Sequence, residues 1–545
     1  MLLTKAPEQA QAEADLAGAQ PRPPITRERI PFVLCQLLVL GWVVRDLAVH
    51  AEAIRRHVGL PFQVDYEEGN ILNALVRITH GLTPYPDPHA IPNILNPYGP
   101  VAYYLLAVPV KLFGVSFLWP RLVIVACVAA ICCFVGLTVA RLTGSALTGL
   151  AFGAMYGTLP VVESWSAVLR VDFLALALST TGVYLFIRGL ATEDTEGKGA
   201  SVVDGVTKSD KIDNRQSTIG NAFSPSVSSV AKPWFSSAAL FVAALFVKYT
   251  YVAAPAACFL YLLAQRRWKP AAWFAGFAAA LAAALLLLSV AATRGTILTH
   301  LFRTHADLFS TDVYLVRMTG IIAMCRVLAV LAAACLIPEL LQRSLSVPAL
   351  WLLIASGTAV TAGKVGSNWN HFLEWPAALC LCAGIGWTKL TRIRPRVLAT
   401  VAGLAATAWL CIFLWRERSL PFNPYATVQD CSQAYAFVKQ YPGDQVLSEN
   451  VGALVLAGKT VWVSNPFVYT QLVMRGGWPD AGLERMVRAR RFDLIVAQWN
   501  YPAYPSFMRN GAERFSSRAV KAIAENYRVV QMYGCTDARV MFERK

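Results

Sequence analysis

The feature that most constrains this chain is a series of apolar segments that recurs from residue 31 to residue 415. A helix needs about 20 apolar residues to cross the hydrocarbon core of a bilayer. The 235–265 run is too long for one such helix and is interrupted by "KYT", so we divide it in two. The chain is therefore expected to be a polytopic α-helical membrane protein with about eleven spans. These spans are predicted at 31–49, 118–140, 145–162, 172–190, 235–247, 251–265, 271–293, 320–341, 347–363, 372–388 and 396–415.

Composition supports the membrane assignment and argues against nucleic acid as a partner. Of the 545 residues, 56% are hydrophobic and only 15% are charged. The formal charge of +16 comes from Lys and Arg in short clusters between apolar segments, which is how membrane topology signals are distributed. Residues 1–29 lack the basic end, short apolar core and cleavage site of a signal peptide. We expect them to form a disordered cytoplasmic tail.

The basic loops predict the orientation of the chain in the membrane. If the apolar stretch 98–115 does not cross, four basic loops face the same side as the N-terminal "RERIP", as the positive-inside rule favours. We therefore interpret 98–115 as a juxtamembrane helix within an outer loop, residues 50–117, and the N-terminus as cytoplasmic. The 294–318 loop, with three arginines on the predicted outer face, does not follow the rule. The four basic loops are 141–144, 265–269, 340–343 and 388–396.

Three further regions complete the domain organisation, with the transmembrane domain spanning residues 30–415. Residues 191–233 are rich in Ser, Gly, Asp and Lys and are predicted to be a disordered cytoplasmic loop. In residues 416–545, short apolar runs alternate with helical stretches, which predicts a small extracytoplasmic α/β domain with a partly parallel sheet. Cys431 and Cys535 both lie there, and an oxidising compartment would allow a disulfide, but sequence alone does not show that they are close.

The stretch "VDYEEGNILNALVRITHGLTPYPD", residues 64–87, holds three carboxylates in four positions on the predicted outer face. Asp65 and Glu68 have the spacing of a capping box, followed by an amphipathic helix that ends before Gly81. A capped surface helix explains every acidic residue except Glu67. A second interpretation is that one carboxylate is a general base placed where a lipid-borne substrate meets water. The two interpretations are compatible.

Other polar residues gather at the predicted outer ends of the spans. Membrane-edge ionisable residues are functional candidates, although each has a structural explanation, because Lys and Arg snorkel and Asn or Asp cap helices. All seven histidines also fall on this face. Together these residues indicate a polar cleft under an amphipathic cover. They are Arg170, Asp172, Lys248, Lys364, Asn368, Asn370, His371 and Glu374.

Several motifs in residues 30–390 resemble those of a known family. They are the outer-loop acid, "HGLTPYPD", "NPYGPVAYYLLAVPVKLFG", "RL" at the start of a span, "ARLTG" inside, "VLRVD" outside, and "GSNWNHFLEW" before a late span. This pattern resembles the GT-C membrane glycosyltransferases, in particular the protein-mannosyltransferase-like enzymes of family 39 and the bacterial aminoarabinose transferases. The resemblance implies a bacterial inner membrane and a juxtamembrane position for 98–115.

The resemblance also implies an activity on the outer face. A sugar, hexosyl or pentosyl, would move from a polyprenyl-phosphate donor to a lipid, glycan or protein acceptor. Asp65 or Glu67, with Glu68 beside it, would be the general base, and Asp172 a second acid that positions a metal or substrate. The D-Y-E-E spacing differs from the tighter acidic pairs of other members, so the base stays open among the three.

Binding roles follow from charge and ligand chemistry. Lys364 or Lys248 is expected to stabilise the departing phosphate, with Arg170 in reserve. Asp65 and Asp172 offer the hard oxygen ligands that suit Mg²⁺ or Mn²⁺, should the enzyme use a divalent metal. The remaining substrate-binding candidates are Asn370, His371 and Glu374.

Two other classes of protein are alternatives to a glycosyltransferase. A transporter or flippase of a lipid-linked substrate tends to have internal inverted repeats and broken helices near the bilayer midplane. No repeat is visible here, and the polar residues lie at one face. A non-catalytic membrane scaffold would have no need for acids at matched outer helix ends.

Overall fold

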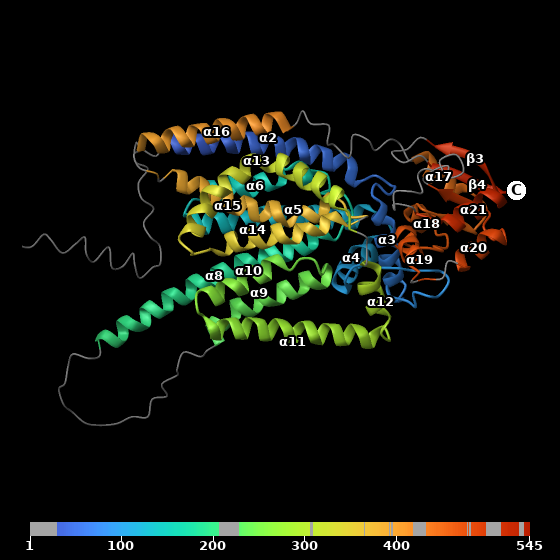
Figure 1. The fold of residues 1–545 in the computed structure, drawn as a ribbon, viewed down its shortest axis with the longest axis horizontal. Coiled ribbons are helices and arrows are strands. Elements are labelled where there is room, and N and C mark those ends of the chain that lie inside the picture. Colours follow the sequence, from blue (N-terminus) through green and yellow to red (C-terminus); the bar gives the residue numbers. More distant parts are fainter. Residues whose placement is uncertain are drawn as a thin grey trace, which may run out of the picture.

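The computed structural model describes residues 30–206, 228–305, 309–364, 366–391, 393, 396–417, 432–476, 478, 481–497, 514–533 and 539–545. Each predicted membrane segment overlaps a helix, although several bounds differ. Figure 1 shows these helices as one elongated bundle, with α2 and α16 side by side along one edge. The bundle helices are α2 (Ile30–Val58), α5 (Leu118–Thr143), α6 (Ala146–Gly157), α8 (Asp172–Val206), α9 (Ser228–Val247), α10 (Ala253–Ala264), α11 (Trp268–Ala292), α13 (Thr311–Leu341), α14 (Val347–Thr358), α15 (Glu374–Leu390) and α16 (Arg396–Glu417).

Six helices in the described ranges are long and apolar enough to cross a membrane: α2, α5, the first part of α8, α11, α13 and residues 397–414 of α16. In α11 only 6% of the most apolar window is buried, and Trp273 and Leu287 project outward. A helix this apolar with so little protein around it is suited to contact lipid. The chain is therefore an integral membrane protein, while the total of eleven crossings stays a prediction because the other helices are shorter.

Small residues allow the bundle helices to approach closely. On α6, a Cβ added at Gly153 would lie 2.4 Å from the Cys132 carbonyl oxygen of α5, so only glycine fits this crossing. Helix α15 is buried along almost its whole length and packs against α13, α14, α5 and α6. The bundle therefore has a protein core as well as a lipid-facing surface.

Residues 50–117, predicted to be the first outer loop and called so below by that prediction, contain two helices, α3 (Tyr66–Thr79) and α4 (Pro100–Phe113), at the end of the bundle (Figure 1). The predicted capping box is confirmed, because the Asp65 and Glu68 side chains each bond to the other's backbone N–H. The expectation of a surface helix is wrong, since every residue from Glu68 to Leu75 is buried. Helix α3 packs against α4 on the bundle and against α18 (Val451–Leu456) beyond it. Its apolar face is therefore covered by protein.

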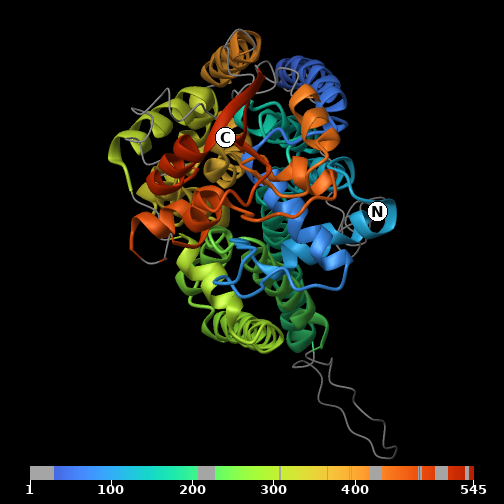
Figure 2. The same cartoon turned by 90° about the vertical axis from the view of Figure 1, so that its right-hand side faces the viewer.

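Residues 432–545, which we call the C-terminal region, lie against this end of the bundle. Figure 2 looks onto that end, with the C-terminal region in orange and red in front. Among its described residues, four strands form a sheet in the order β1-β2-β4-β3, with β1 and β2 parallel and the other pairs antiparallel. The strands are β1 (Val446–Ser448), β2 (Leu494–Ala497), β3 (Tyr527–Tyr533) and β4 (Arg539–Arg544), and the other helices are α17 (Ser432–Gln440), α19 (Pro466–Met474), α20 (Ala481–Arg488) and α21 (Ser517–Asn526).

The sheet agrees with the predicted partly parallel arrangement, with two differences. The segment "TVWVS" is not a strand of the sheet; its Val463 instead forms an isolated bridge with Asn93 of the first outer loop. Strand β4 was not predicted. Cys431, Cys535, the tail 1–29 and residues 207–227 lie outside the described residues, whereas α8 continues through residue 206 and α9 begins at residue 228, so helix occupies both ends of the segment predicted to be a disordered loop.

Candidate functional site

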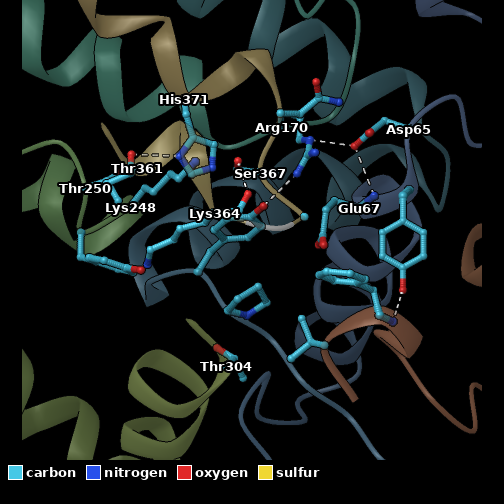
Figure 3. A pocket seen from close by; sticks show the side chains of 18 of the residues that line it. Asp65, Glu67, Arg170, Lys248, Thr250, Thr304, Thr361, Lys364, Ser367 and His371 are labelled. Carbon is cyan, nitrogen blue, oxygen red and sulfur yellow. Dashed lines mark hydrogen bonds and ion pairs between the residues drawn. The ribbon is translucent and has the colours of Figure 1, made fainter. Parts of the chain in front are cut away.

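A cavity of about 280 Å³ lies where the first outer loop, the ends of the bundle helices and the C-terminal region meet (Figure 3). Four basic and two acidic side chains line it, so it suits an anionic group. Its charged residues are Asp65, Glu67, Arg170, Lys248, Lys364 and Arg514, and its other lining residues include Tyr66, Tyr98, Thr250, Thr304, Thr361, Ser367, Asn368, His371, Phe467 and Val468.

Asp65, which caps α3, pairs with Arg170. The Asp65 Oδ1 atom lies 2.7 Å from Arg170 Nε, and Arg170 Nη1 donates to the Tyr98 hydroxyl at 3.0 Å. Burial raises the pKa of the Asp65 carboxyl, and the neighbouring Arg170 opposes this only in part. Asp65 is thus already engaged by a cation on one side and by the Glu67 backbone N–H on the other.

Glu67 lines the same cavity, and neutral donors hold its carboxylate. Asn465 Nδ2 donates to Glu67 Oε1 at 3.1 Å, and Asn70 Nδ2 donates to Oε2 at 3.3 Å. In Figure 3 the Glu67 carboxylate points into the space below the Asp65–Arg170 pair. Among the described residues, the Glu67 carboxylate is held by amides and forms no ion pair, so it is free of the cationic partner that Asp65 has.

Asp172 forms a second buried cluster next to the cavity. Lys248 Nζ lies 2.6 Å from Asp172 Oδ1, and Asn370 Nδ2 donates to both carboxylate oxygens at 3.1 Å. His371 and Glu374 join Asp172, Lys248 and Asn370 around an adjoining void of about 10 Å³. Five residues predicted from separate segments of the sequence therefore come together here.

His371 faces the main cavity, in surroundings that disfavour its protonated form. Burial and the nearby cations Lys248 and Arg170 lower the pKa of His371 well below its usual range. Its Nδ1 is 3.2 Å from the Thr361 hydroxyl. Glu374 lies deeper, where it accepts bonds from the Ala254 backbone N–H and the Trp351 indole N–H.

Glu68 differs from the other candidate acids because it lines neither the main cavity nor the adjoining void. Its side chain is fully buried against Arg121, also fully buried, with oxygen–nitrogen distances of 2.7 and 2.8 Å. The backbone N–H groups of Val64 and Leu169 also donate to it. Both oxygens of the Glu68 carboxylate thus accept hydrogen bonds from the protein itself.

The residues present do not fit the predicted divalent metal site. In the described part of the chain, no group of three or more His, Cys, Asp or Glu side chains could hold an ion. The two proposed ligands, Asp65 and Asp172, each bond to a cationic side chain instead of converging on one point.

The sequence did not indicate that the C-terminal region would contribute to the cavity. Phe467 and Val468 lie in the first turn of α19, and Arg514 places its guanidinium 3.7 Å from the centre of the Tyr66 ring. Asn465 is 398 positions from Glu67 along the chain. The only signal, "NPF", predicts a helix start with Pro at the first position; it gives no information about which distant residue that helix contacts.

Comparisons with known proteins place this geometry in a known architecture. The sequence matches no family model and no curated protein sequence. The apo crystal structure of ArnT from Cupriavidus metallidurans superposes with a TM-score of 0.58 at 12% identity, over 92% of this chain and 97% of that one. The same ArnT bound to undecaprenyl phosphate gives 0.57 at 12% identity, over 92% and 98%.

A second protein gives a weaker match to the same architecture. The apo Archaeoglobus fulgidus oligosaccharyltransferase superposes with a TM-score of 0.50 at 10% identity, over 92% of this chain and 74% of that chain. ArnT, an aminoarabinose transferase, and this oligosaccharyltransferase are both glycosyltransferases built on the GT-C fold. The chain has the GT-C fold. The GT-C resemblance predicted from the outer-loop motifs is thereby confirmed for the fold, and the cavity lies in a GT-C bundle between its first outer loop and its C-terminal region.

Proposed function

We propose that this GT-C protein transfers a sugar from a polyprenyl-phosphate donor to an acceptor hydroxyl, with Glu67 as general base. The observation that carries the proposal is the cavity itself. It places one carboxylate held by neutral amides opposite a basic wall, at the end of an apolar bundle. A lipid-borne phosphodiester needs this combination: a base for the acceptor, cations for the phosphate and access from a membrane.

The reaction would proceed by substitution at the anomeric carbon of the sugar. The acceptor oxygen forms a bond to this carbon as its proton passes to the Glu67 carboxylate. The bond from the anomeric carbon to the phosphate oxygen breaks, and its electron pair leaves with the polyprenyl phosphate. General-base help of this kind is typically worth about 10²–10⁴-fold in rate.

Basic side chains would stabilise the negative charge that develops on the leaving phosphate. Lys248 and Lys364 line the bundle side of the cavity, and Arg514 lines it from the C-terminal region. Two of the four are already paired with a carboxylate, Arg170 with Asp65 and Lys248 with Asp172. Preorganised charges aimed at a developing charge are usually the largest single catalytic contribution.

The cellular setting follows from the basic loops and the GT-C neighbours. We place the N-terminus in the cytoplasm and the cavity on the outer face of a bacterial inner membrane. ArnT binds undecaprenyl phosphate, which supports a polyprenyl-phosphate carrier here. The acceptor would be a lipid, glycan or protein of the cell envelope.

The experiment that tests this proposal uses the full-length protein in vesicles with a panel of labelled polyprenyl-phosphate sugars. We expect one donor to be consumed, with free polyprenyl phosphate released, and Glu67→Gln to stop the release. If labelled donor crosses the bilayer chemically unchanged, the protein is a flippase. If no donor is consumed or moved, the proposed function is wrong.

A further inference from the structure

We propose that Asn465, in the C-terminal region, is the positioning residue that orients Glu67 for proton transfer. This inference rests on the proposed role of Glu67 as the base. It assigns the C-terminal region a direct part in the reaction, through one amide that reaches across to the first outer loop. Nothing else in the described part of that region donates a hydrogen bond to Glu67.

Hydrogen bonds fix the orientation of the Asn465 amide. Asn465 is fully buried at the N-terminus of α19, where its Oδ1 accepts from the Val468 N–H at 3.1 Å as a helix cap. The same oxygen accepts from the Tyr66 hydroxyl at 3.2 Å. With the oxygen side used twice, only the NH₂ group remains to face Glu67, to which it donates.

The segment that carries Asn465 is attached to the outer loop just before it. Asn93 N–H donates to the Trp462 carbonyl at 2.8 Å, and Ser464 N–H donates to the Asn93 carbonyl at 3.0 Å. The Ser464 hydroxyl accepts from the Leu95 N–H at 2.8 Å. Asn465 is thus held at a defined position relative to α3, as a residue that positions a catalytic group must be.

The second amide at Glu67 is a weaker anchor. Asn70 donates at the longer distance of 3.3 Å, and its own Oδ1 has no hydrogen-bond partner among the residues that the structure describes. Because Asn70 is on the same helix as Glu67, it also moves with it. Asn465 is therefore the group that fixes the carboxylate relative to the rest of the cavity.

The test is the pH dependence of turnover in Asn465→Asp. Aspartate is as good a helix cap as asparagine, so α19 is retained, but a carboxylate replaces the donor and repels the charge of Glu67. Like charges favour the protonated form. The acid limb of the kcat profile should therefore move to higher pH by about one unit or more. The substitution does not alter the other charged side chains around Glu67. These are Asp65, Glu68, Arg170, Lys248, Lys364 and Arg514.

Asn450 provides a matched control, because it caps α18 through the Ala453 N–H in the same region and does not line the cavity. Asn450→Asp should leave the profile unchanged.

Asn465→Ser keeps a cap but cannot reach Glu67, so kcat should fall about tenfold or more with KM near that of wild type. Asn465→Ala and Asn450→Ala should lower Tm similarly, which separates capping from positioning.

The outcomes distinguish this inference from the proposed function. If wild type turns over a donor and Asn465→Asp has the wild-type pH profile, Asn465 is only a helix cap and the inference is wrong. If Asn450→Asp shifts the profile equally, the effect belongs to the region's fold, and the inference is again wrong. If wild type consumes no donor, the proposed function is wrong, and the role of Asn465 that rests on it is wrong as well.

Discussion

Glu67 and Glu68 are adjacent on α3, but their side chains lie in two different regions of the molecule. Glu68 is enclosed with Arg121 beneath the helix, where backbone N–H groups and a guanidinium occupy its oxygens. Glu67 borders a cavity, and in the described part of the chain two amides hold it. The same residue type thus has two roles: Glu68 connects the outer loop to the bundle, and Glu67 remains available to a ligand.

The difference follows from how α3 is placed. Because α3 is covered on one side by α4 and on another by the C-terminal region, successive side chains at its N-terminus reach different surroundings. A buried charge requires a partner, and Arg121 supplies it to Glu68. A carboxylate next to an open cavity, such as that of Glu67, can instead interact with a ligand that enters the cavity. Access, more than residue type, separates a structural carboxylate from a candidate base.

The largest expected effect comes from breaking the enclosed pair with Arg121→Met. This change leaves the Glu68 charge buried without a partner and removes the donor to the Leu60 and Phe62 carbonyls. Removing one partner of a buried pair typically costs about 3–5 kcal/mol of folding free energy. The amount of folded protein in membranes and its Tm should both fall sharply. Turnover per folded molecule should stay near that of wild type; a selective loss of turnover would place this pair in the active site.

The next effect is expected at the cavity wall. Lys248→Met should lower kcat about 10²-fold or more, because it removes a cation proposed to stabilise the leaving phosphate. It also leaves Asp172 buried without its cation, so it should be combined with Asp172→Asn. We expect the double variant to regain most of the lost Tm but none of the lost turnover. Recovery of both would show that this pair is structural, like Glu68 and Arg121.

A third prediction concerns a neutral connection between the outer loop and the bundle. His300 on α12 (Thr296–Phe302) accepts from the Asn96 N–H and bonds to the Pro86 carbonyl, and burial lowers its pKa to about 4. The unfolded chain therefore binds a proton first, so stability is lost as pH falls from about 6.5 towards 4. Between pH 7.5 and 5, about 2 kcal/mol should be lost.

His300→Gln provides the comparison for this prediction, since glutamine keeps a donor and an acceptor without titrating. Chemical denaturation of wild type and His300→Gln at the two pH values would measure the difference. The variant should lose less stability than wild type on acidification. Equal losses in the two proteins would assign the acid sensitivity to other groups.

The helices of the bundle were largely predictable from the sequence because hydrophobic length is a local signal. The capping box of α3 and the outer-end residues Arg170, Asp172 and Lys248 were found in the same way. What could not be predicted was which side chains pair with which. Assigning Glu68 to the interior required Arg121, 53 positions away, and finding Asn465 required knowing that α19 lies over α3. Contacts at such separations leave no local pattern in a single sequence.

The proposed reaction depends most on Glu67, and one paired measurement tests this role directly: Tm and donor turnover of purified Glu67→Gln, beside wild type and Glu52→Gln as an exposed control. Glu52 pairs only with Arg55 and Arg56 of its own helix in the described structure, and exposed pairs of this kind contribute little. We predict that Glu67→Gln keeps a Tm close to that of wild type and loses turnover by about 10²-fold or more. Turnover within a few-fold of wild type in the folded variant would contradict the central claim.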